Sequence, residues 1–174
     1  MQQWQQNIMP PAGELVRVGP KHVKQFKELW LNNKWPCAIC GKPFTAKDVA
    51  VVDHSHENGI IRGCLHNTCN RVEGELLGFA KRVSPETSEA WLLDVCAQVS
   101  RGRTAGKRIN LIAKWCHSGV GVNEYLLGLQ NYLIWHQVRR TRMIHPNHKF
   151  PNEGGSNYKK HDKKSLWFKR RRRR

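Results

Sequence analysis

The chain is short of acidic residues and has no long apolar segment. It carries 13 Asp and Glu against 30 Lys and Arg in 174 residues, a formal net charge of +17. No apolar run approaches the ~20 residues that a membrane-spanning helix needs, and the first residues lack the charged and apolar regions of a secretory signal. No internal repeat is evident. These absences argue against a membrane protein, a repeat array and a secreted protein, and they predict a cytoplasmic location.

The excess of positive charge predicts a polyanionic partner, with nucleic acid as the natural candidate and an anionic membrane as the weaker one. Residues 158–174 hold ten Lys or Arg and one Asp, a balance of +9, which leaves +8 on residues 1–157. Such a surface neutralises phosphates and releases counterions, an effect that does not depend on base sequence. The residues predicted to contact DNA in this tail are Lys169, Arg170, Arg171, Arg172, Arg173 and Arg174.

Two ligand pairs of equal spacing predict a structural zinc site. Cys37-Ala-Ile-Cys40 supplies the first pair, and the second comes from Cys64, His66 and Cys69. His66 and Cys69 repeat the spacing of the first pair, with 25 residues between the pairs, so spacing favours His66 over Cys64. In a reducing compartment this pattern favours metal binding over disulfides. Four protein ligands leave no open position for water, so catalysis would need other residues.

Between and after the zinc pairs lie groups suited to phosphodiester hydrolysis. Asp53 and Asn70 offer oxygen ligands for a catalytic Mg²⁺ or Mn²⁺. His54 can act as the general base, because a neutral imidazole accepts a proton near physiological pH. His56 could contact the phosphate, orient water or assist the leaving group. Together these residues predict a hydrolytic metal centre.

Two further side chains complete the candidate site. Glu73 lies three residues after Asn70 on a predicted helix, so the two share a face, and Glu73 could support the metal or His56. Arg62 is a candidate phosphate contact through its forked donors. One geometric condition applies: strict strand alternation would send Asp53 and His54 to opposite faces. A bend or a bulge at Asp53 is therefore required if both serve one centre.

Periodicity predicts an α+β fold that is mainly helical. Apolar residues recur at helical spacing over 23–30, and valines at 49–52 and isoleucines at 60–61 favour strands. Asn58-Gly59 between them is a strong hairpin signal. A helical pattern over 72–83 follows, which gives the order strand, strand, helix. The parts expected are an arm at 1–20, a zinc-stapled nuclease core at 21–83, a region of packing helices at 84–145, and a linker with a disordered basic tail at 146–174.

The combined motifs resemble the phage recombination endonuclease VII family, a zinc-containing branch of the HNH or ββα-metal nucleases. The residues that carry the resemblance lie within 21–80: Cys37-Ala-Ile-Cys40-Gly41, Asp53-His54-Ser55-His56, Arg62-Gly63, Cys69-Asn70 and Glu73-Gly74. The resemblance implies DNA cleavage, Mg²⁺ on Asp53 and Asn70, His54 as base, a site completed by His56 and Glu73, and a phage-infected bacterium as the setting. The family usually has CxxC as its second zinc pair, where this chain has His66xxCys69.

Several alternatives stay open at the level of sequence. The chain could be a zinc-containing nucleic-acid-binding protein without catalysis, or an RNA-associated or structural phage protein in which the tail matters most. The motifs do not separate a resolvase of branched DNA from a nicking or homing nuclease, and no feature selects a homodimer over a monomer. His145 and His148 could be metal ligands, but a loop histidine pair without partners is more often a polar surface feature, and they are interpreted as such.

Deleting residues 158–174 tests the role of the tail. We expect the shortened chain to keep cutting DNA at low salt and to lose activity earlier as salt rises, because fewer counterions are released on binding. The measurement is Mg²⁺-dependent plasmid cleavage by both chains between about 50 and about 200 mM salt. Equal salt dependence of the two chains would show that the tail is no electrostatic anchor.

Overall fold

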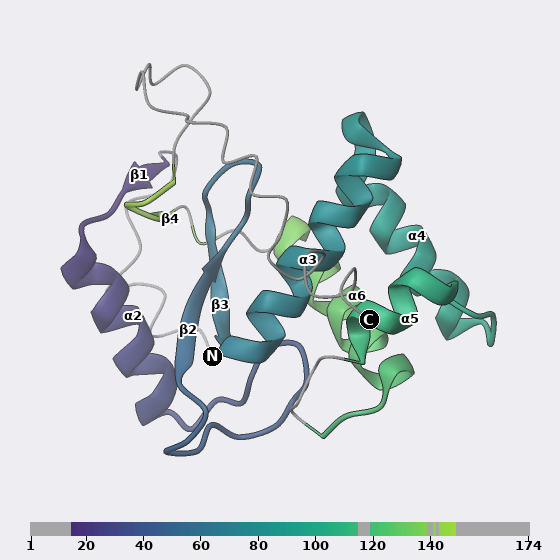
Figure 1. Cartoon of the computed structure of the whole chain (residues 1–174). Coiled ribbons are helices and arrows are strands. Elements are labelled where there is room, and N and C mark those ends of the chain that lie inside the picture. The colour runs from purple at the N-terminus through teal and green to yellow at the C-terminus, as the bar shows by residue number, and fades with distance from the viewer. Residues whose placement is uncertain (1–14, 115–118, 139–140, 142, 149–174) are drawn as a thin grey trace, which may run out of the picture.

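The computed structural model describes residues 15–114, 119–138, 141 and 143–148, and the predicted DNA contacts at 169–174 lie outside these residues (Figure 1). The described part is mixed α and β and mainly helical, as predicted. No helix in it is long and apolar enough to cross a membrane. The elements are β1 (Val16–Arg17), α2 (Pro20–Asn32), β2 (Ala50–His54), β3 (Ile61–His66), α3 (Asn67–Val83), the 3₁₀ helix η1 (Pro85–Thr87), α4 (Ser88–Ser100), α5 (Lys107–Ala113), α6 (Val122–Val138) and β4 (Met143–Ile144).

Strands β2 and β3 form the predicted antiparallel hairpin, and it contains a bulge. Asp53 pairs with Gly63, but the next pair is His54 with Ile61, so Arg62 has no partner on β2. An extra residue of this kind breaks the alternation of side chains and bends the strand. Of the two irregularities considered at Asp53, a bend or a bulge, the structure has the bulge, and the extra residue lies on the second strand.

The turn of the hairpin is longer than a two-residue Asn-Gly turn. The amide of Ser55 donates to the carbonyl of Ile60, and the amide of Gly59 donates back to the carbonyl of Ser55. Gly59 has φ of 72°, whereas Asn58 is not in the left-handed region and instead accepts a hydrogen bond from the Ile60 amide through its side chain. The Asn-Gly signal therefore predicted the hairpin correctly but not its turn geometry.

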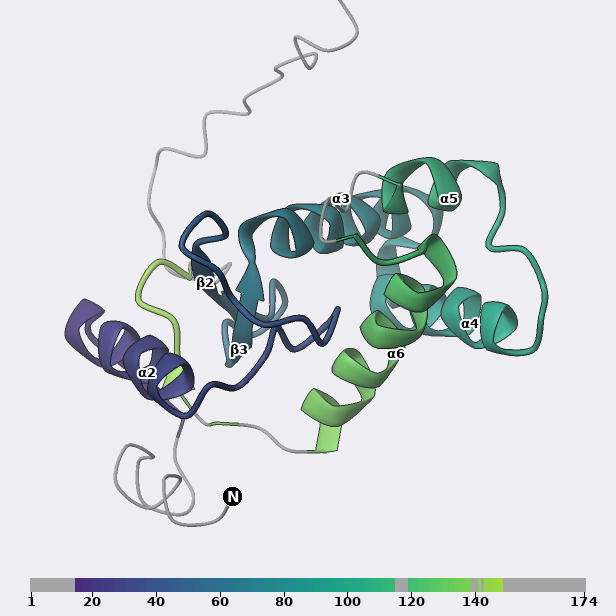
Figure 2. The same cartoon turned by 90° about the horizontal axis from the view of Figure 1, so that it is seen from below.

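Helix α2 covers one side of the hairpin, as Figures 1 and 2 show. The helix begins at Pro20, whose fixed φ suits a first helical position. Its buried residue Phe26 packs into a small core with Val18, Ile61, Cys64 and Met143. The predicted helix ahead of the cysteines is thus present.

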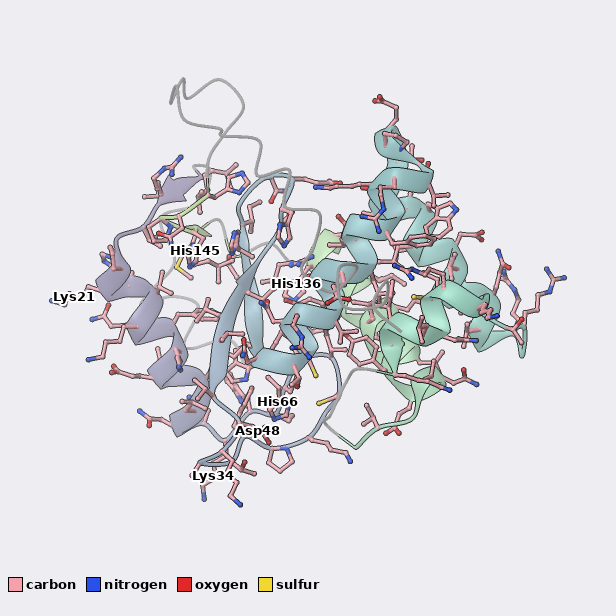
Figure 3. The ribbon with its side chains drawn as sticks, in the orientation of Figure 1. Lys21, Lys34, Asp48, His66, His136 and His145 are labelled. Atoms are coloured by element: carbon pink, nitrogen blue, oxygen red, sulfur yellow. The ribbon has the colours of Figure 1, made fainter. Side chains whose placement is uncertain are left out.

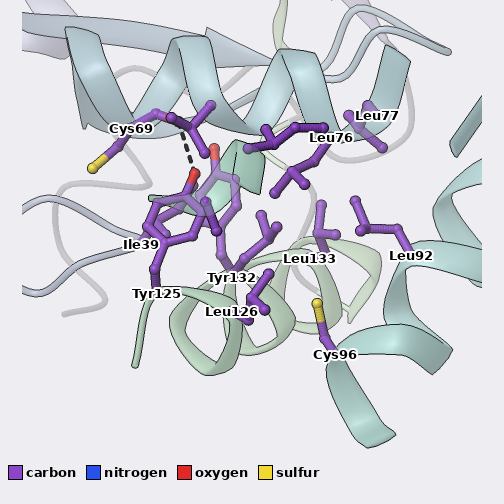
Figure 4. Packing of buried hydrophobic residues seen from close by; sticks show 14 of the residues in the cluster. Ile39, Cys69, Leu76, Leu77, Leu92, Cys96, Tyr125, Leu126, Tyr132 and Leu133 are labelled. Atoms are coloured by element: carbon purple, nitrogen blue, oxygen red, sulfur yellow. Dashed lines mark hydrogen bonds between the residues drawn. The ribbon is translucent and has the colours of Figure 1, made fainter. Parts of the chain in front are cut away.

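Helices α3, α4, α5 and α6 gather on the other side of the hairpin and enclose the main core (Figure 2). Leu76, Leu92 and Leu133, one from each of α3, α4 and α6, are fully buried there (Figure 4). The same core takes in Cys37 and Cys69, so apolar packing continues up to the cysteine pairs. The hydroxyl of Tyr125 on α6 donates to the carbonyl of Cys69 at 2.9 Å, which ties the last helix to the start of α3.

After α6 the chain returns to the hairpin. We call residues 141–148, of which Arg142 is not described, the return segment. The hydroxyl of Thr141 donates to the carbonyl of Ile61 at 2.6 Å. Strand β4 then pairs in parallel with β1, as Figure 1 shows, and Ile144 also bridges to Ile60 beside the turn. Residues 146–148, which were predicted to belong to a linker, lie beside the hairpin turn.

Gly128 in α6 offers a test of how closely the last helix packs. A Cβ added there would overlap the carbonyl oxygen of Ile39, in the loop between Cys37 and Cys40. We expect Gly128→Ala to lower the free energy of unfolding by about 1–3 kcal/mol, because a rigid backbone group must move. Gly78→Ala on α3 is the matched control, since nothing lies within 4 Å of its added Cβ.

For Gly78→Ala we expect no loss, or a gain of up to about 1 kcal/mol from helix propensity. Urea unfolding followed by circular dichroism measures both variants. Equal stability of the two would contradict the close contact between α6 and the Cys37–Cys40 loop.

Candidate functional site

Four side chains from three parts of the chain converge into a metal-binding group. The ligand atoms of Cys37, Cys40, His66 and Cys69 all lie within 4.8 Å of one another, and all four residues are buried. The first two come from the loop before β2, His66 ends β3, and Cys69 lies in the first turn of α3. Within the described residues, no other group of His, Cys, Asp or Glu converges in this way. Three thiols and one imidazole fit Zn²⁺.

The hydrogen bonds of His66 show which ring nitrogen faces the metal position. Nε2 lies 3.3 Å from the carbonyl oxygen of Pro43, and Nδ1 lies 3.3 Å from the sulfur of Cys40. A carbonyl only accepts, so Nε2 carries the proton and Nδ1 is the unprotonated nitrogen that can bind zinc. A histidine ligand whose other nitrogen donates to a carbonyl is the usual arrangement around zinc.

The electrostatics of Cys40 suit a metal, whereas the hydrogen bond with Cys40 raises the pKa of Cys37. The hydrogen bond from Cys37 lowers the pKa of Cys40 well below its usual range, with a second contribution from Cys69. A thiolate is the form that binds metal. Cys64 differs: it lies in the small core beside Phe26, and burial raises the pKa of its thiol to about 12. The structure therefore brings His66 into the group and leaves Cys64 out, as the spacing predicted.

A buried arginine joins the two carboxylates of the predicted catalytic site. Nε of Arg62 donates to Oδ2 of Asp53 at 2.8 Å, and Nη2 donates to Oε1 of Glu73 at 2.6 Å. Nη2 also lies 3.4 Å from the carbonyl oxygen of His54. Only 4% of Arg62 is exposed. In this structure Arg62 therefore holds carboxylates, where the sequence analysis expected a phosphate contact.

Glu73 is completely buried on α3. Burial raises the pKa of its carboxyl, and the charge of Arg62 opposes that change. Its second oxygen, Oε2, has no hydrogen-bond partner among the described residues. A buried carboxylate oxygen without a donor is uncommon and calls for an explanation such as an ion or a water.

Tyr132 is a member of the site that sequence reasoning missed. Its hydroxyl donates to Oδ2 of Asp53, and its ring lies 5.2 Å from the guanidinium of Arg62. Burial raises the pKa of Tyr132 well above its ordinary value, so it stays a protonated donor. Tyr132 lies on the buried face of α6 beside Leu129 and Leu133, and this apolar pattern concealed its polar contact.

Asn70 and His56 lie at the edges of this arrangement. Asn70 is half-buried in the first turn of α3, and it lies one turn before Glu73 on that helix. His56 is exposed in the turn, with its ring 5.8 Å from that of His54. The structure thus joins Asp53 and Glu73 through Arg62, and it places His56 in the turn and Asn70 at the start of α3.

His54 is surrounded by histidines, and two of them come from the return segment. The ring of His145 stacks on that of His54 with centroids 4.4 Å apart and planes 9° apart, and the ring of His148 lies 6.0 Å away edge-on. Burial lowers the pKa of His54 to about 4, with a second contribution from His145. Figure 3 places His145 nearer the turn and His66 at the other end of the hairpin. The interpretation of His145 and His148 as surface residues without partners was wrong.

Comparison with known proteins agrees with this geometry. The family model of recombination endonuclease VII matches residues 14–95, which include both zinc pairs and every catalytic residue predicted above. Residues 14–95 belong to the recombination endonuclease VII family. No curated protein and no solved structure gives a match. The resemblance inferred from the motifs is confirmed.

The match to the endonuclease VII family model indicates a nuclease that acts on DNA. The matched segment ends within α4, so it stops before Tyr132 and before the return segment. Two elements outside the endonuclease VII match therefore reach the residues around Asp53 and His54.

Zinc analysis of single variants tests the ligand set. We expect one Zn²⁺ per chain in the purified protein, with the metal lost in His66→Ala and Cys69→Ser because three ligands hold zinc poorly. Cys64→Ala should keep its zinc and lose only packing energy. Inductively coupled plasma mass spectrometry and a colorimetric zinc assay measure the content. Zinc loss in Cys64→Ala together with retention in His66→Ala would reverse the assignment.

Proposed function

We propose that this protein is a metal-dependent endonuclease that hydrolyses DNA phosphodiester bonds at a ββα-metal, HNH-type centre formed by β2, β3 and α3. The observation that carries the proposal is the bulge at Arg62, where a buried guanidinium ties Asp53 on the hairpin to Glu73 on α3. This contact holds Asp53, the proposed metal ligand, close to α3. Membership of the endonuclease VII family supports the same chemistry.

The donor groups suit a hard divalent cation. Asp53 supplies a carboxylate and Asn70 an amide oxygen, which are ligands that Mg²⁺ and Mn²⁺ prefer. Both hydrogen bonds to Asp53 go to Oδ2, so Oδ1 is the oxygen we assign to the cation. The partnerless Oε2 of Glu73 fits a place near a cation or its bound water. A bound Mg²⁺ would stabilise negative charge on the phosphate during attack.

The remaining side chains are assigned the roles of base, phosphate contact and positioning residue. We assign His54 the role of general base, because a neutral imidazole can take a proton from the attacking water. His56, exposed beside it in the turn, is placed to contact the phosphate or the leaving group. Arg62 and Tyr132 position Asp53 through their bonds to Oδ2.

The proposed activity leaves two choices, which concern the structure of the DNA that is cut and the number of cuts. Resolution of branched DNA needs two coordinated cuts and hence a pair of centres, as in a homodimer, whereas nicking needs one. A side-by-side assay of linear duplex, nicked circle and four-way junction with Mg²⁺ separates a resolvase from a nicking or homing nuclease. The basic tail would hold any of these substrates through phosphates, in the cytoplasm of a phage-infected cell.

One observation favours a different function, a zinc-containing protein that binds nucleic acid without cutting it. Oδ2 of Asp53 already accepts bonds from Arg62 and Tyr132, so the carboxylate is partly occupied without any metal. Under this alternative the Arg62 contacts serve stability alone. Purified protein that binds DNA but never cuts it with Mg²⁺ or Mn²⁺ would establish the alternative.

Replacing His54 tests the catalytic proposal. We expect His54→Ala to slow Mg²⁺-dependent cutting by about 10²–10⁴-fold, the usual contribution of a general base, while DNA binding and the fold persist. Plasmid and four-way-junction cleavage measure the rate, and gel-shift titration measures binding. His22→Ala, an exposed histidine on α2, is the matched control and should cut like the wild type. Unchanged cutting by His54→Ala would remove His54 from the mechanism.

A further inference from the structure

The return segment brings two histidines to the proposed catalytic base from outside the family-matched region. His145 and His148 lie about fifty residues beyond the end of that region at residue 95. Their rings lie 4.4 Å and 6.0 Å from the ring of His54. The residues that give the family match therefore do not include everything that contacts this base.

The ring of His54 is held by contacts between rings. The backbone carbonyl of His54 lies 3.4 Å from Arg62, but no hydrogen bond reaches its imidazole from the residues that the structure describes. The closest ring is that of His145, nearly parallel at 9°, which covers one face of the imidazole. A general base must present one nitrogen in a fixed direction, and small misplacements slow the reaction strongly. The plane of the His54 ring must therefore be fixed by a contact, and the nearest ring is that of His145.

His145 is itself fixed independently of His54. Its backbone amide donates to the carbonyl of Gly59 at 2.8 Å, and its Nδ1 accepts a hydrogen bond from the amide of Asn147 at 3.3 Å. Its own carbonyl accepts from the amide of His148 at 3.0 Å. Arg17 anchors the end of the segment through the carbonyl of His148 at 2.6 Å. The ring that stacks on His54 therefore belongs to a braced turn.

Gly59 permits this close approach to the hairpin turn. Any side chain at Gly59 would overlap the ring of His148, and the left-handed φ of 72° also favours glycine. The absence of a Cβ thus lets the return segment lie against the turn that follows His54 and carries His56. Gly59 therefore permits the contact with His148 in two ways, through its left-handed backbone and through its lack of a side chain.

We propose that His145 is a positioning residue for the nuclease reaction, whose ring stacks on His54 and fixes the plane of the proposed base. The inference rests on the function proposed above for His54. The contact is made by ring faces, and one nitrogen of His145 is already bonded to Asn147. A flat ring at position 145 is therefore what the role requires, and a ring nitrogen is not.

Two substitutions at position 145 separate stacking from proton chemistry. His145→Phe keeps a flat ring and removes both nitrogens, whereas His145→Ala removes the ring. We expect His145→Ala to lower kcat about tenfold or more, in line with the loss of an aromatic pair and the misplacement of a base. KM for DNA should stay unchanged. We expect His145→Phe to restore most of kcat, and His22→Ala to match the wild type.

A second measurement reports on His54 directly. In NMR spectra of protein labelled at histidine, the ring protons of His54 should lie in the ring current of residue 145. The shift should be lost in His145→Ala and kept in His145→Phe. The fold of each variant is checked by its thermal unfolding and its zinc content, so that a loss of structure is not taken for a loss of positioning.

Each result supports or overturns the proposal. Wild-type kcat in His145→Ala overturns it, and so does a His145→Phe variant that is folded but as slow as His145→Ala, which would assign proton transfer or phosphate contact to the imidazole nitrogens. If the wild type cuts no DNA, the proposed function fails. The His54 ring shifts then still decide whether residue 145 holds that ring.

Discussion

The buried guanidinium of Arg62 joins the hairpin to the helix that follows it. It contacts Asp53 on β2 and Glu73 on α3, and all three side chains are nearly or fully withdrawn from water. Removing one partner of such a group leaves an uncompensated buried charge, which is strongly destabilising. The distance between Asp53, the proposed metal ligand, and α3, which carries Asn70, therefore depends on this contact. The bulge makes it available, because Arg62 is the residue that β2 leaves unpaired.

The metal-binding group lies at the end of the hairpin away from its turn, where His66 ends β3. Its members are Cys37, Cys40, His66 and Cys69. A two-stranded hairpin is barely stable alone, and here the strands end at a group that draws in the preceding loop and the first turn of α3. The bond from Tyr125 to the carbonyl of Cys69 extends the connection to α6. The metal-binding group at one end and Arg62 in the middle thus hold β2, β3 and α3 in one arrangement.

Residues beyond the endonuclease VII match complete the site. Tyr132 reaches Asp53 from α6, and the return segment places His145 on the ring of His54. The same segment passes through the small core beside α2, where Met143 is fully buried. Helix α6 and the return segment therefore contact the hairpin at Asp53 and His54, two of the residues proposed for catalysis.

The sequence by itself determined the metal-binding group, the order strand, strand, helix, and the need for a bend or a bulge near Asp53 if Asp53 and His54 serve one centre. These follow from ligand spacing, from local periodicity and from the alternation of side chains along a strand, all of which are short-range properties. The tertiary structure alone decided what Arg62, Tyr132 and His145 do. Arg62 contacts carboxylates because a bulge turns it inward, and Tyr132 and His145 reach Asp53 and His54 across about eighty or ninety residues of chain. No local pattern records such contacts, because they depend on where α6 and the return segment pack against the hairpin.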